Sequence, residues 1–119
     1  MAQPEHTLVI TGGNAGIGLT CARAIAAAEP RAHLVLACRD VGRASVEAQR
    51  IAAASGARVE ALPLDLASLA SVREFAARLQ ADGRPPLRAL VCNAGTQVVS
   101  GTRYTHDGIE LTFGVNHLG

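Results

Sequence analysis

Glycines cluster directly behind a short apolar run near the start of the chain, in the segment 11–18 (TGGNAGIG). The run Leu8, Val9, Ile10 predicts a strand, and apolar residues at helical spacing after the glycines predict a helix. A glycine loop between a strand and a helix leaves no β-carbon between the backbone and a ligand. It also directs unpaired N–H groups and the positive end of the helix dipole to one point. This arrangement suits a pyrophosphate, and the alternative is a glycine-rich turn that only packs the helix on the strand.

Four motifs in a fixed order carry a resemblance to a known family. The glycine spacing resembles the TGxxxGIG motif of the short-chain dehydrogenase/reductase family, whose cofactor loop would here comprise Gly12, Asn14, Gly16, Ile17 and Gly18. Three further motifs follow in the family's order: DL at 65–66, NAG at 93–95 and FGVNHLG at 113–119. The resemblance runs from His6 onward and looks most like the branch of retinol dehydrogenases and protochlorophyllide reductases. It implies a Rossmann-type fold and an oxidoreductase that transfers hydride between a nicotinamide cofactor and a carbonyl or alcohol.

The end of the predicted second strand favours NADP as the cofactor. Sites that prefer NAD place an acidic residue about 20 residues beyond the glycine motif, whereas an arginine there accommodates the 2′-phosphate of NADP. Cys38 stands twenty residues after Gly18, and Arg39 follows it. We therefore predict that Arg39 binds the 2′-phosphate, with a further contact from Asn14. The alternative is a solvated arginine that pairs with Asp40 or is simply exposed.

The resemblance assigns the adenine end of the cofactor to the DL motif. Asp65 would accept a hydrogen bond from the adenine amino group, and Leu66 would offer its backbone N–H to the ring. A carboxylate at the carboxyl end of a strand lies where open α/β sheets bind ligands. The alternative for Asp65 is a helix cap, a role that Ser68 or Ser71 could also fill.

Two later motifs complete the set that the resemblance implies. Asn93, Ala94 and Gly95 would end the fourth strand and pass close to the ribose of the cofactor, where small residues allow the backbone to approach. The amide of Asn93 could instead serve to tie neighbouring loops together. Asn116 would be the one catalytic residue of this chain, supporting a water that relays protons to the family's lysine; the alternative is an ordinary helical asparagine.

The remaining catalytic groups of the family have no counterpart in the sequence. The family's Tyr-x-x-x-Lys pair needs a lysine, yet all eleven basic residues are arginine, which does not release its proton. Tyr104 is the only tyrosine, and Gly108 stands four residues after it. Ser100 lies too early to be the family's serine. We expect Tyr104 to be a packing or surface residue and the 119-residue chain alone to be inactive.

Strand and helix periods alternate along the chain. Asp40 and Gly56 are placed to cap the helix between the second and third strands, and Gly83 to end the next helix. A last helix begins near Asp107, which has capping-box spacing to Glu110. Right-handed crossovers then give a doubly wound parallel α/β sheet of strand order 3-2-1-4, truncated after the fourth strand and the start of the following helix. The predicted strands cover residues 8–11, 34–37, 59–62 and 90–93, and the helical stripes cover 44–52 and 72–79.

Composition limits the remaining possibilities. Hydrophobic residues make up 49% of the chain and aromatic residues 3%, so the core must be built from small and aliphatic side chains. A net charge of +1 gives no electrostatic case for nucleic acid or an anionic membrane. The sequence has no apolar run of membrane-spanning length and no secretion signal, so we expect a cytoplasmic protein. The four histidines lack metal-ligand spacing, and we predict Cys21, Cys38 and Cys92 to be small buried fillers.

Two functions of different class are consistent with these residues. In the first, residues 1–119 are the NADP-binding Rossmann-type domain of a short-chain dehydrogenase/reductase whose catalytic C-terminal part is absent. Its partners would be a small-molecule carbonyl or alcohol and, at full length, a second copy in a homo-oligomer. In the second, the chain is a non-catalytic nucleotide-binding or interaction fragment.

Overall fold

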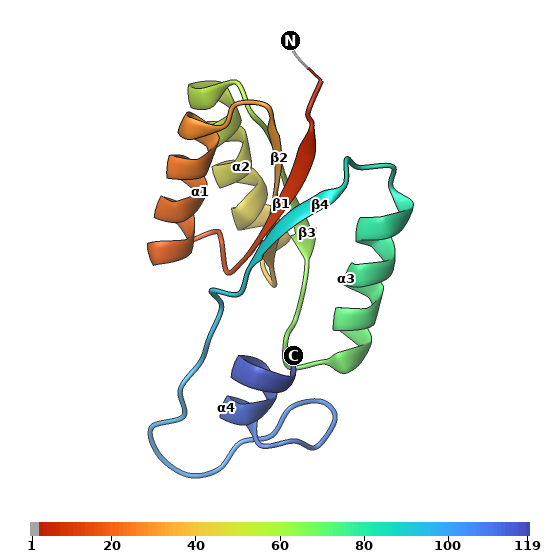
Figure 1. Cartoon of the computed structure of the whole chain (residues 1–119). Coiled ribbons are helices and arrows are strands. Elements are labelled where there is room, and N and C mark those ends of the chain that lie inside the picture. The colour runs from red at the N-terminus through yellow and green to blue at the C-terminus, as the bar shows by residue number, and fades with distance from the viewer. Residues whose placement is uncertain (1–2) are drawn as a thin grey trace.

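Strands and helices alternate along the chain in the computed structural model, which describes residues 3–119 (Figure 1). The elements are β1 (His6–Thr11), α1 (Gly16–Ala28), β2 (Ala32–Cys38), α2 (Val41–Ser55), β3 (Arg58–Pro63), α3 (Leu69–Ala81), β4 (Leu87–Val91), α4 (Leu111–Phe113) and the π-helical turn η1 (Gly114–Leu118). Each of the first three helices connects two strands, so the chain is built from consecutive βαβ units.

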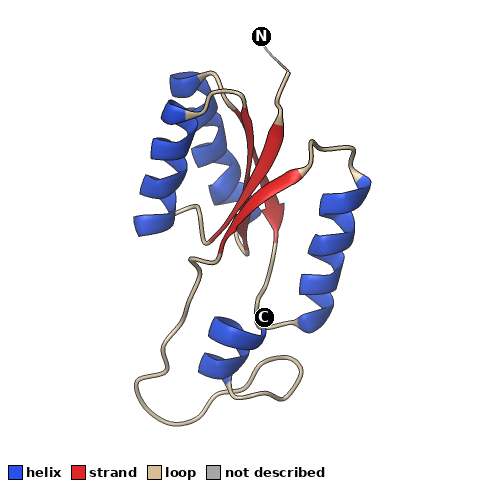
Figure 2. Ribbon diagram, viewed as in Figure 1, coloured by secondary structure: helices blue, strands red, loops and turns tan. Residues whose placement is uncertain are grey.

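The four strands form one parallel sheet in the order β3-β2-β1-β4. In its centre β1 and β2 pair residue for residue, with Val9 beside Val35 and Ile10 beside Leu36. Helices α1 and α2 cover one face of the sheet and α3 covers the other (Figure 2). The predicted doubly wound sheet and its strand order are therefore confirmed.

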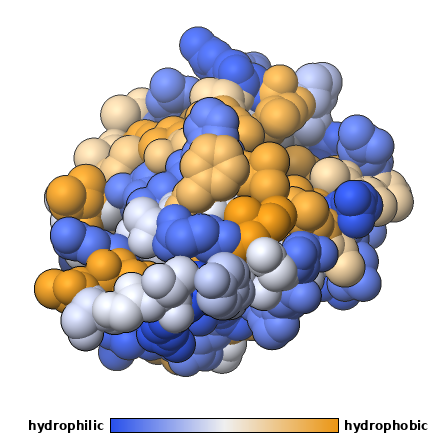
Figure 3. Space-filling model, turned by 90° about the horizontal axis from the view of Figure 1, so that it is seen from below, coloured by the Kyte–Doolittle hydropathy of each residue, from blue (hydrophilic) through white to orange (hydrophobic). Residues whose placement is uncertain are grey.

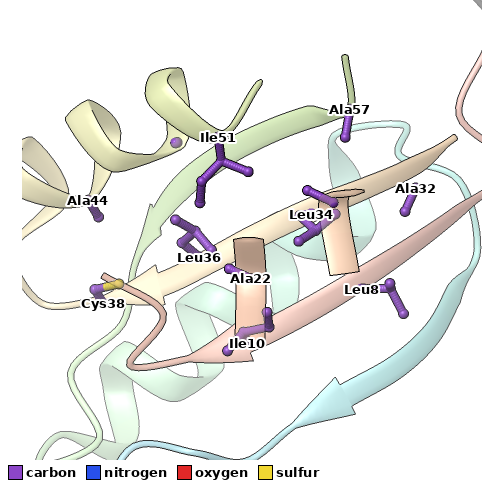
Figure 4. Packing of buried hydrophobic residues seen from close by; sticks show 12 residues of the cluster. Leu8, Ile10, Ala22, Ala32, Leu34, Leu36, Cys38, Ala44, Ile51 and Ala57 are labelled. Carbon is purple, nitrogen blue, oxygen red and sulfur yellow. The ribbon is translucent and has the colours of Figure 1, made fainter. Parts of the chain in front are cut away.

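The face under α1 and α2 holds the larger part of the core. Ile10, Leu34 and Leu36 are completely buried there, and each contributes about 2 kcal/mol by leaving water. The helices meet these side chains mainly with alanines, among them Ala22 of α1 and Ala44 of α2 (Figure 4). Small helix residues let the helix axes approach the sheet closely, which explains how a chain with few aromatic residues closes its core.

The opposite face has a second and smaller core. Val9 and Val35 are completely buried there and pack with Leu62, Leu64 and Phe75, the last of these from α3. Because β1 and β2 bury side chains on both faces, their sequences contain continuous apolar runs, which are typical of strands in parallel sheets covered on both faces.

Helix ends agree with the sequence for the middle helices. Asp40 caps α2 by accepting a hydrogen bond from the Arg43 N–H, and Gly56 ends it in the left-handed conformation with φ of 79°. The N-cap of helix α3 is Ser68, whose hydroxyl accepts from the Ser71 N–H, and the helix ends at Ala81 shortly before Gly83. The predicted caps of α2 are confirmed.

The fourth strand is shorter at its carboxyl end than predicted. It ends at Val91, so Cys92 and Asn93 lie beyond it. The chain leaves the sheet because the Asn93 N–H is directed at the Val91 carbonyl and the Thr11 hydroxyl. Cys92 is consequently exposed, and the prediction that it is a buried filler within a strand was wrong.

The last helix also begins later than predicted. Its first residue is Leu111, and its N-cap is Glu110, whose carboxylate accepts from Thr112 and Phe113. Asp107 does not start the helix, because Gly108 turns the chain with φ of 77° and the Asp107 carboxylate is bonded elsewhere. The hydrogen bonds to Glu110 lower the pKa of its carboxyl.

The end of the molecule that carries α4 exposes apolar side chains among polar ones (Figure 3). Phe113 of α4 and Leu118 of η1 are 53% and 46% exposed. Within residues 3–119, none of the helices is both long enough and apolar enough to cross a lipid bilayer.

Candidate functional site

The glycine loop joins the end of β1 to the start of α1 and is built for close backbone approach. Gly12 and Gly16 have φ of 66° and 54°, in the left-handed region that side-chain-bearing residues rarely adopt. Gly18, in the first turn of α1, has no free space. A β-carbon there would collide with the carbonyl oxygen of Gly12 and the amide of Asn93.

The start of α1 differs from the starts of the other helices. Its N-cap is Ala15, and no side chain among residues 3–119 caps it, whereas Asp40, Ser68 and Glu110 cap α2, α3 and α4. The first N–H groups of an α-helix have no partner within the helix. The uncapped start of α1 therefore offers donors, together with the positive end of the helix dipole, to an anion.

Hydrogen bonds between Thr11 and Asn93 fix the ends of β1 and β4 relative to each other. The Thr11 hydroxyl accepts from the backbone N–H groups of Asn93 and Ala94, each at 3.0 Å. The Asn93 amide donates to the carbonyls of Thr11 and Gly12 at 3.1 and 3.3 Å. The predicted tie between loops is thus present. Thr11, which sequence reasoning did not single out, is its other half.

A pocket of about 780 Å³ opens at the carboxyl ends of the strands. This is the edge at which open parallel sheets bind ligands. Eight of the predicted site residues line it together: Gly12, Asn14, Arg39, Asp65, Leu66, Asn93, Ala94 and Gly95. Gly16, Ile17 and Gly18 lie outside this lining at the start of α1, where Ile17 is 83% exposed.

The side of the pocket at the end of β2 is basic. Arg39 and Arg43 both line it, and within residues 3–119 neither pairs with a carboxylate. Burial raises the pKa of the neighbouring Cys38 thiol, against hydrogen bonds from the loop backbone that lower it, so this position adds no negative charge. The carboxylate of Asp40 is directed to the start of α2. Sequence reasoning missed Arg43; its place in the first turn of the helix after the second strand is the signal that could have found it.

Asp65 and Leu66 also line the pocket, from the loop between β3 and α3. The Asp65 carboxylate accepts from the Ala67 N–H at 2.9 Å and lies 3.4 Å from the Nε2 atom of His106. Because Ser68 is the N-cap of α3, Asp65 is not the helix cap of the alternative interpretation. Asp65 lines the pocket instead.

Asn116 lies in η1 and does not line this pocket. Its Oδ1 atom accepts from the Thr96 N–H at 2.7 Å, and its Nδ2 atom donates to the Thr96 carbonyl at 2.8 Å. Asn116 therefore holds the loop after β4, of which Thr96 borders the pocket. On its other side it borders a second, more apolar hollow of about 680 Å³ between β4 and α3.

The part of the chain that the structure describes contains no group of three or more His, Cys, Asp or Glu side chains that could hold a metal ion. Tyr104 is 65% exposed and pairs through a β-bridge with Glu110, in agreement with the expected surface position. The site therefore offers backbone N–H groups, the guanidinium groups of Arg39 and Arg43, the carboxylates of Asp40 and Asp65, and small residues.

Sequence comparisons place this arrangement among known proteins. The chain is 47% identical to the human (Homo sapiens) WW domain-containing oxidoreductase over 94% of its length, and 44% identical to protochlorophyllide reductase of Chlamydomonas reinhardtii over 98%. It spans only 26% and 29% of these two relatives.

Solved structures give the same result. A short-chain dehydrogenase from Sphingobium yanoikuyae in complex with NADPH superposes with a TM-score of 0.77 and 36% identity, over 95% of this chain and 43% of that one. An alcohol dehydrogenase from Thermococcus sibiricus complexed with 5-hydroxy-NADP superposes with a TM-score of 0.76 and 29% identity, over 94% and 47%. The family described as short chain dehydrogenase matches residues 6–119. The chain therefore belongs to the short-chain dehydrogenase family and carries the parallel sheet and flanking helices of its Rossmann-type fold.

Proposed function

We propose that residues 1–119 are an NADP(H)-binding domain, belonging to an oxidoreductase that transfers hydride between the nicotinamide and a small carbonyl or alcohol. The observation that carries the proposal is the pair of arginines on one side of the pocket. Arg39 and Arg43 bring two positive charges to the end of β2, where Cys38 occupies the position of the carboxylate typical of NAD sites. Two cations that line one pocket, neither paired with a carboxylate within residues 3–119, favour an anionic ligand such as the 2′-phosphate.

The other residues of the pocket fit the rest of the cofactor. The uncapped start of α1, beside Gly16, Ile17 and Gly18, would receive the pyrophosphate, and Asn14 would add a contact on the phosphate side. Asp65 and the Leu66 N–H would receive the adenine. These assignments follow the family resemblance and rest on the position of each group at the pocket edge.

The segment after β4 would complete the site on the ribose side. The small residues Ala94 and Gly95 line the pocket there, and the Asn93 amide holds them against the glycine loop. We propose that Asn116 is the residue of this chain closest to the site of hydride transfer. It holds the loop after β4 through its hydrogen bonds with Thr96. The cofactor, when bound, would supply or accept the hydride.

Binding is the activity that we assign to the 119-residue chain itself. The family's catalytic Tyr-x-x-x-Lys requires a lysine that this sequence does not contain. We therefore expect the chain to bind NADPH without oxidising it in the presence of a carbonyl compound. For a longer protein carrying this domain, we propose a cytoplasmic location, a small-molecule substrate and a homo-oligomer, with the exposed Phe113 and Leu118 available for an interface.

Titration of the chain with NADPH and NADH tests the proposal, with nicotinamide fluorescence and thermal shift followed together. We expect tighter binding of NADPH by on the order of tenfold, since its extra phosphate forms charge-assisted hydrogen bonds. Arg39→Asp should abolish that preference and Arg43→Ala should reduce it. Arg73→Asp, on the exposed side of α3, is the matched control and should leave it unchanged. Equal affinity for the two nucleotides would overturn the assignment of the phosphate site, and the lack of binding to either would overturn the proposed function.

A further inference from the structure

The loop between β4 and α4 returns toward the start of α3 and contacts the loop that carries Asp65 (Figure 1). Three contacts join the two loops. The His106 N–H donates to the Ala67 carbonyl at 2.9 Å, and the Leu69 N–H donates to the Asp107 carboxylate at 2.8 Å. In the third contact, the Nε2 atom of His106 lies 3.4 Å from the Oδ2 atom of Asp65. Segments 38 residues apart in the sequence are thereby held together.

The turn that supplies these contacts is braced by its own hydrogen bonds. The Thr105 hydroxyl accepts from the N–H groups of Asp107 and Ile109, each at 3.2 Å. The Thr105 N–H donates to the Ile109 carbonyl at 2.7 Å, and Gly108 supplies the left-handed conformation that closes the turn. These bonds define the turn from which His106 and Asp107 contact Asp65 and Leu69.

The contacts fix the direction of the Asp65 carboxylate. The Oδ1 atom accepts from the Ala67 N–H, and the Oδ2 atom faces His106. The backbone N–H of Asp65 donates to the Ser71 hydroxyl. A carboxylate oxygen accepts more than one hydrogen bond, so both oxygens keep capacity for a donor in the pocket. His106 and Asp107 do not themselves line the pocket, and they can affect a ligand only through the loop that does.

Asp107 does more than satisfy a free N–H group at the start of α3. Ser68 already caps α3 by accepting from Ser71. Asp107 binds a different donor, the N–H of Leu69, from a distant part of the chain. Its bond therefore sets where the start of α3, and with it the loop before α3, lies relative to the β4–α4 loop.

We propose that His106 and Asp107 are positioning residues that orient Asp65 toward the adenine amino group, and so make the site selective for adenine. This inference rests on the proposed function, because it requires that the dinucleotide occupies the pocket with its adenine at Asp65. It adds that the selectivity for the base depends on a turn outside the pocket, independently of the arginines that select the 2′-phosphate.

The test compares NADPH with reduced nicotinamide hypoxanthine dinucleotide phosphate, in which an oxygen replaces the adenine amino group. The unsubstituted chain should bind NADPH more tightly by on the order of tenfold, since the analogue presents a carbonyl oxygen to the carboxylate where adenine presents its amino donor. His106→Ala and Asp107→Ala should each bring this ratio toward one. Both variants should keep the preference for NADPH over NADH, because Arg39 and Arg43 are untouched.

Two further variants separate positioning from stability. Asp107→Asn keeps a side-chain oxygen that can accept from Leu69, so it should retain most of the adenine selectivity. Ser68→Ala weakens the capping of the same helix without removing the contacts between the loops, and it should leave the selectivity unchanged. His106→Ala removes no helix cap, so it remains informative if Asp107→Ala does not fold.

The outcomes are distinguishable. If the chain binds NADPH and discriminates against the hypoxanthine analogue, but both alanine variants retain that discrimination, the positioning role is refuted. Equal binding of NADPH and the hypoxanthine analogue by the unsubstituted chain also refutes it, because Asp65 would then make no selective contact with the adenine amino group. A chain that binds neither nucleotide contradicts the proposed function instead.

Discussion

Replacement of Glu60 by glutamine is expected to destabilise the fold by about 2 kcal/mol at pH 7. The Glu60 carboxylate accepts from Arg84 through Nε at 3.0 Å and through a terminal nitrogen at 2.7 Å, and it also contacts His33. The Arg84 side chain is only 7% exposed, so the loss of its partner leaves a nearly buried cation. Removal of one member of a buried pair costs about 3–5 kcal/mol. We reduce that figure because Glu60 is 30% exposed and Asp82 still accepts from Arg84 at 3.1 Å.

The pH dependence of this network has a definite sign. Burial would raise the pKa of Glu60, but the hydrogen bonds from Arg84 and His33 outweigh burial and lower it. A carboxyl whose pKa is lower in the folded state stabilises the fold above its unfolded pKa of about 4.3, and this stabilisation is lost as the pH falls through the folded value. The free-energy difference between the original chain and Glu60→Gln should therefore shrink when the pH is lowered from neutral into that range.

Urea unfolding followed by far-UV circular dichroism at a series of pH values measures both effects. Glu74→Gln is the matched control, because Glu74 is exposed on α3 and its substitution should change the free energy of unfolding by less than about 0.5 kcal/mol. If Glu60→Gln unfolds at the same urea concentration as the control at pH 7, the network does not contribute as the geometry indicates. A difference that grows as the pH falls through this range would refute the assigned direction of the pKa change.

Three further predictions concern the pocket and its supports. Gly18→Ala should destabilise the chain by about 2 kcal/mol in urea unfolding, because a β-carbon would collide with the carbonyl of the glycine loop; unchanged stability would show that the loop can move aside. Asp40→Ala should cost about 1 kcal/mol by the same assay through the lost cap of α2, and a neutral result would mean that water replaces the cap. Maleimide labelling with mass spectrometry should modify the exposed Cys92 before the buried Cys38, whose pKa is raised by burial; labelling in the opposite order would contradict the burial of the β2 end.

Local signals in the sequence were sufficient for the sheet and its middle helices. The alternation of apolar runs and helical stripes identified the four strands and their order, because short right-handed crossovers leave few alternatives. Asp40 and Gly56 mark the ends of α2 correctly, since both act through neighbours within a few residues. Predictions of this kind depend only on the local chain.

The errors occurred where a distant residue competes with a local pattern. Asp107 has the spacing of a helix cap, but the N–H of Leu69 takes its carboxylate and the helix starts at Leu111. Cys92 continues an apolar run, yet the chain leaves the sheet at Val91 because Thr11 of β1 accepts hydrogen bonds from the residues that follow. Neither partner can be identified from the sequence without the fold.

The two sides of the pocket are held in different ways, and this difference decides how they respond to substitution. Hydrogen bonds between Thr11, at the end of β1, and Asn93, just after β4, join the glycine loop to the sheet itself. The Asp65 side lies in a loop fixed to the distant turn at His106 and Asp107. Local opening of that turn would release Asp65 while the sheet stays intact. Selectivity for the base should consequently be lost under milder conditions than the fold or the phosphate site.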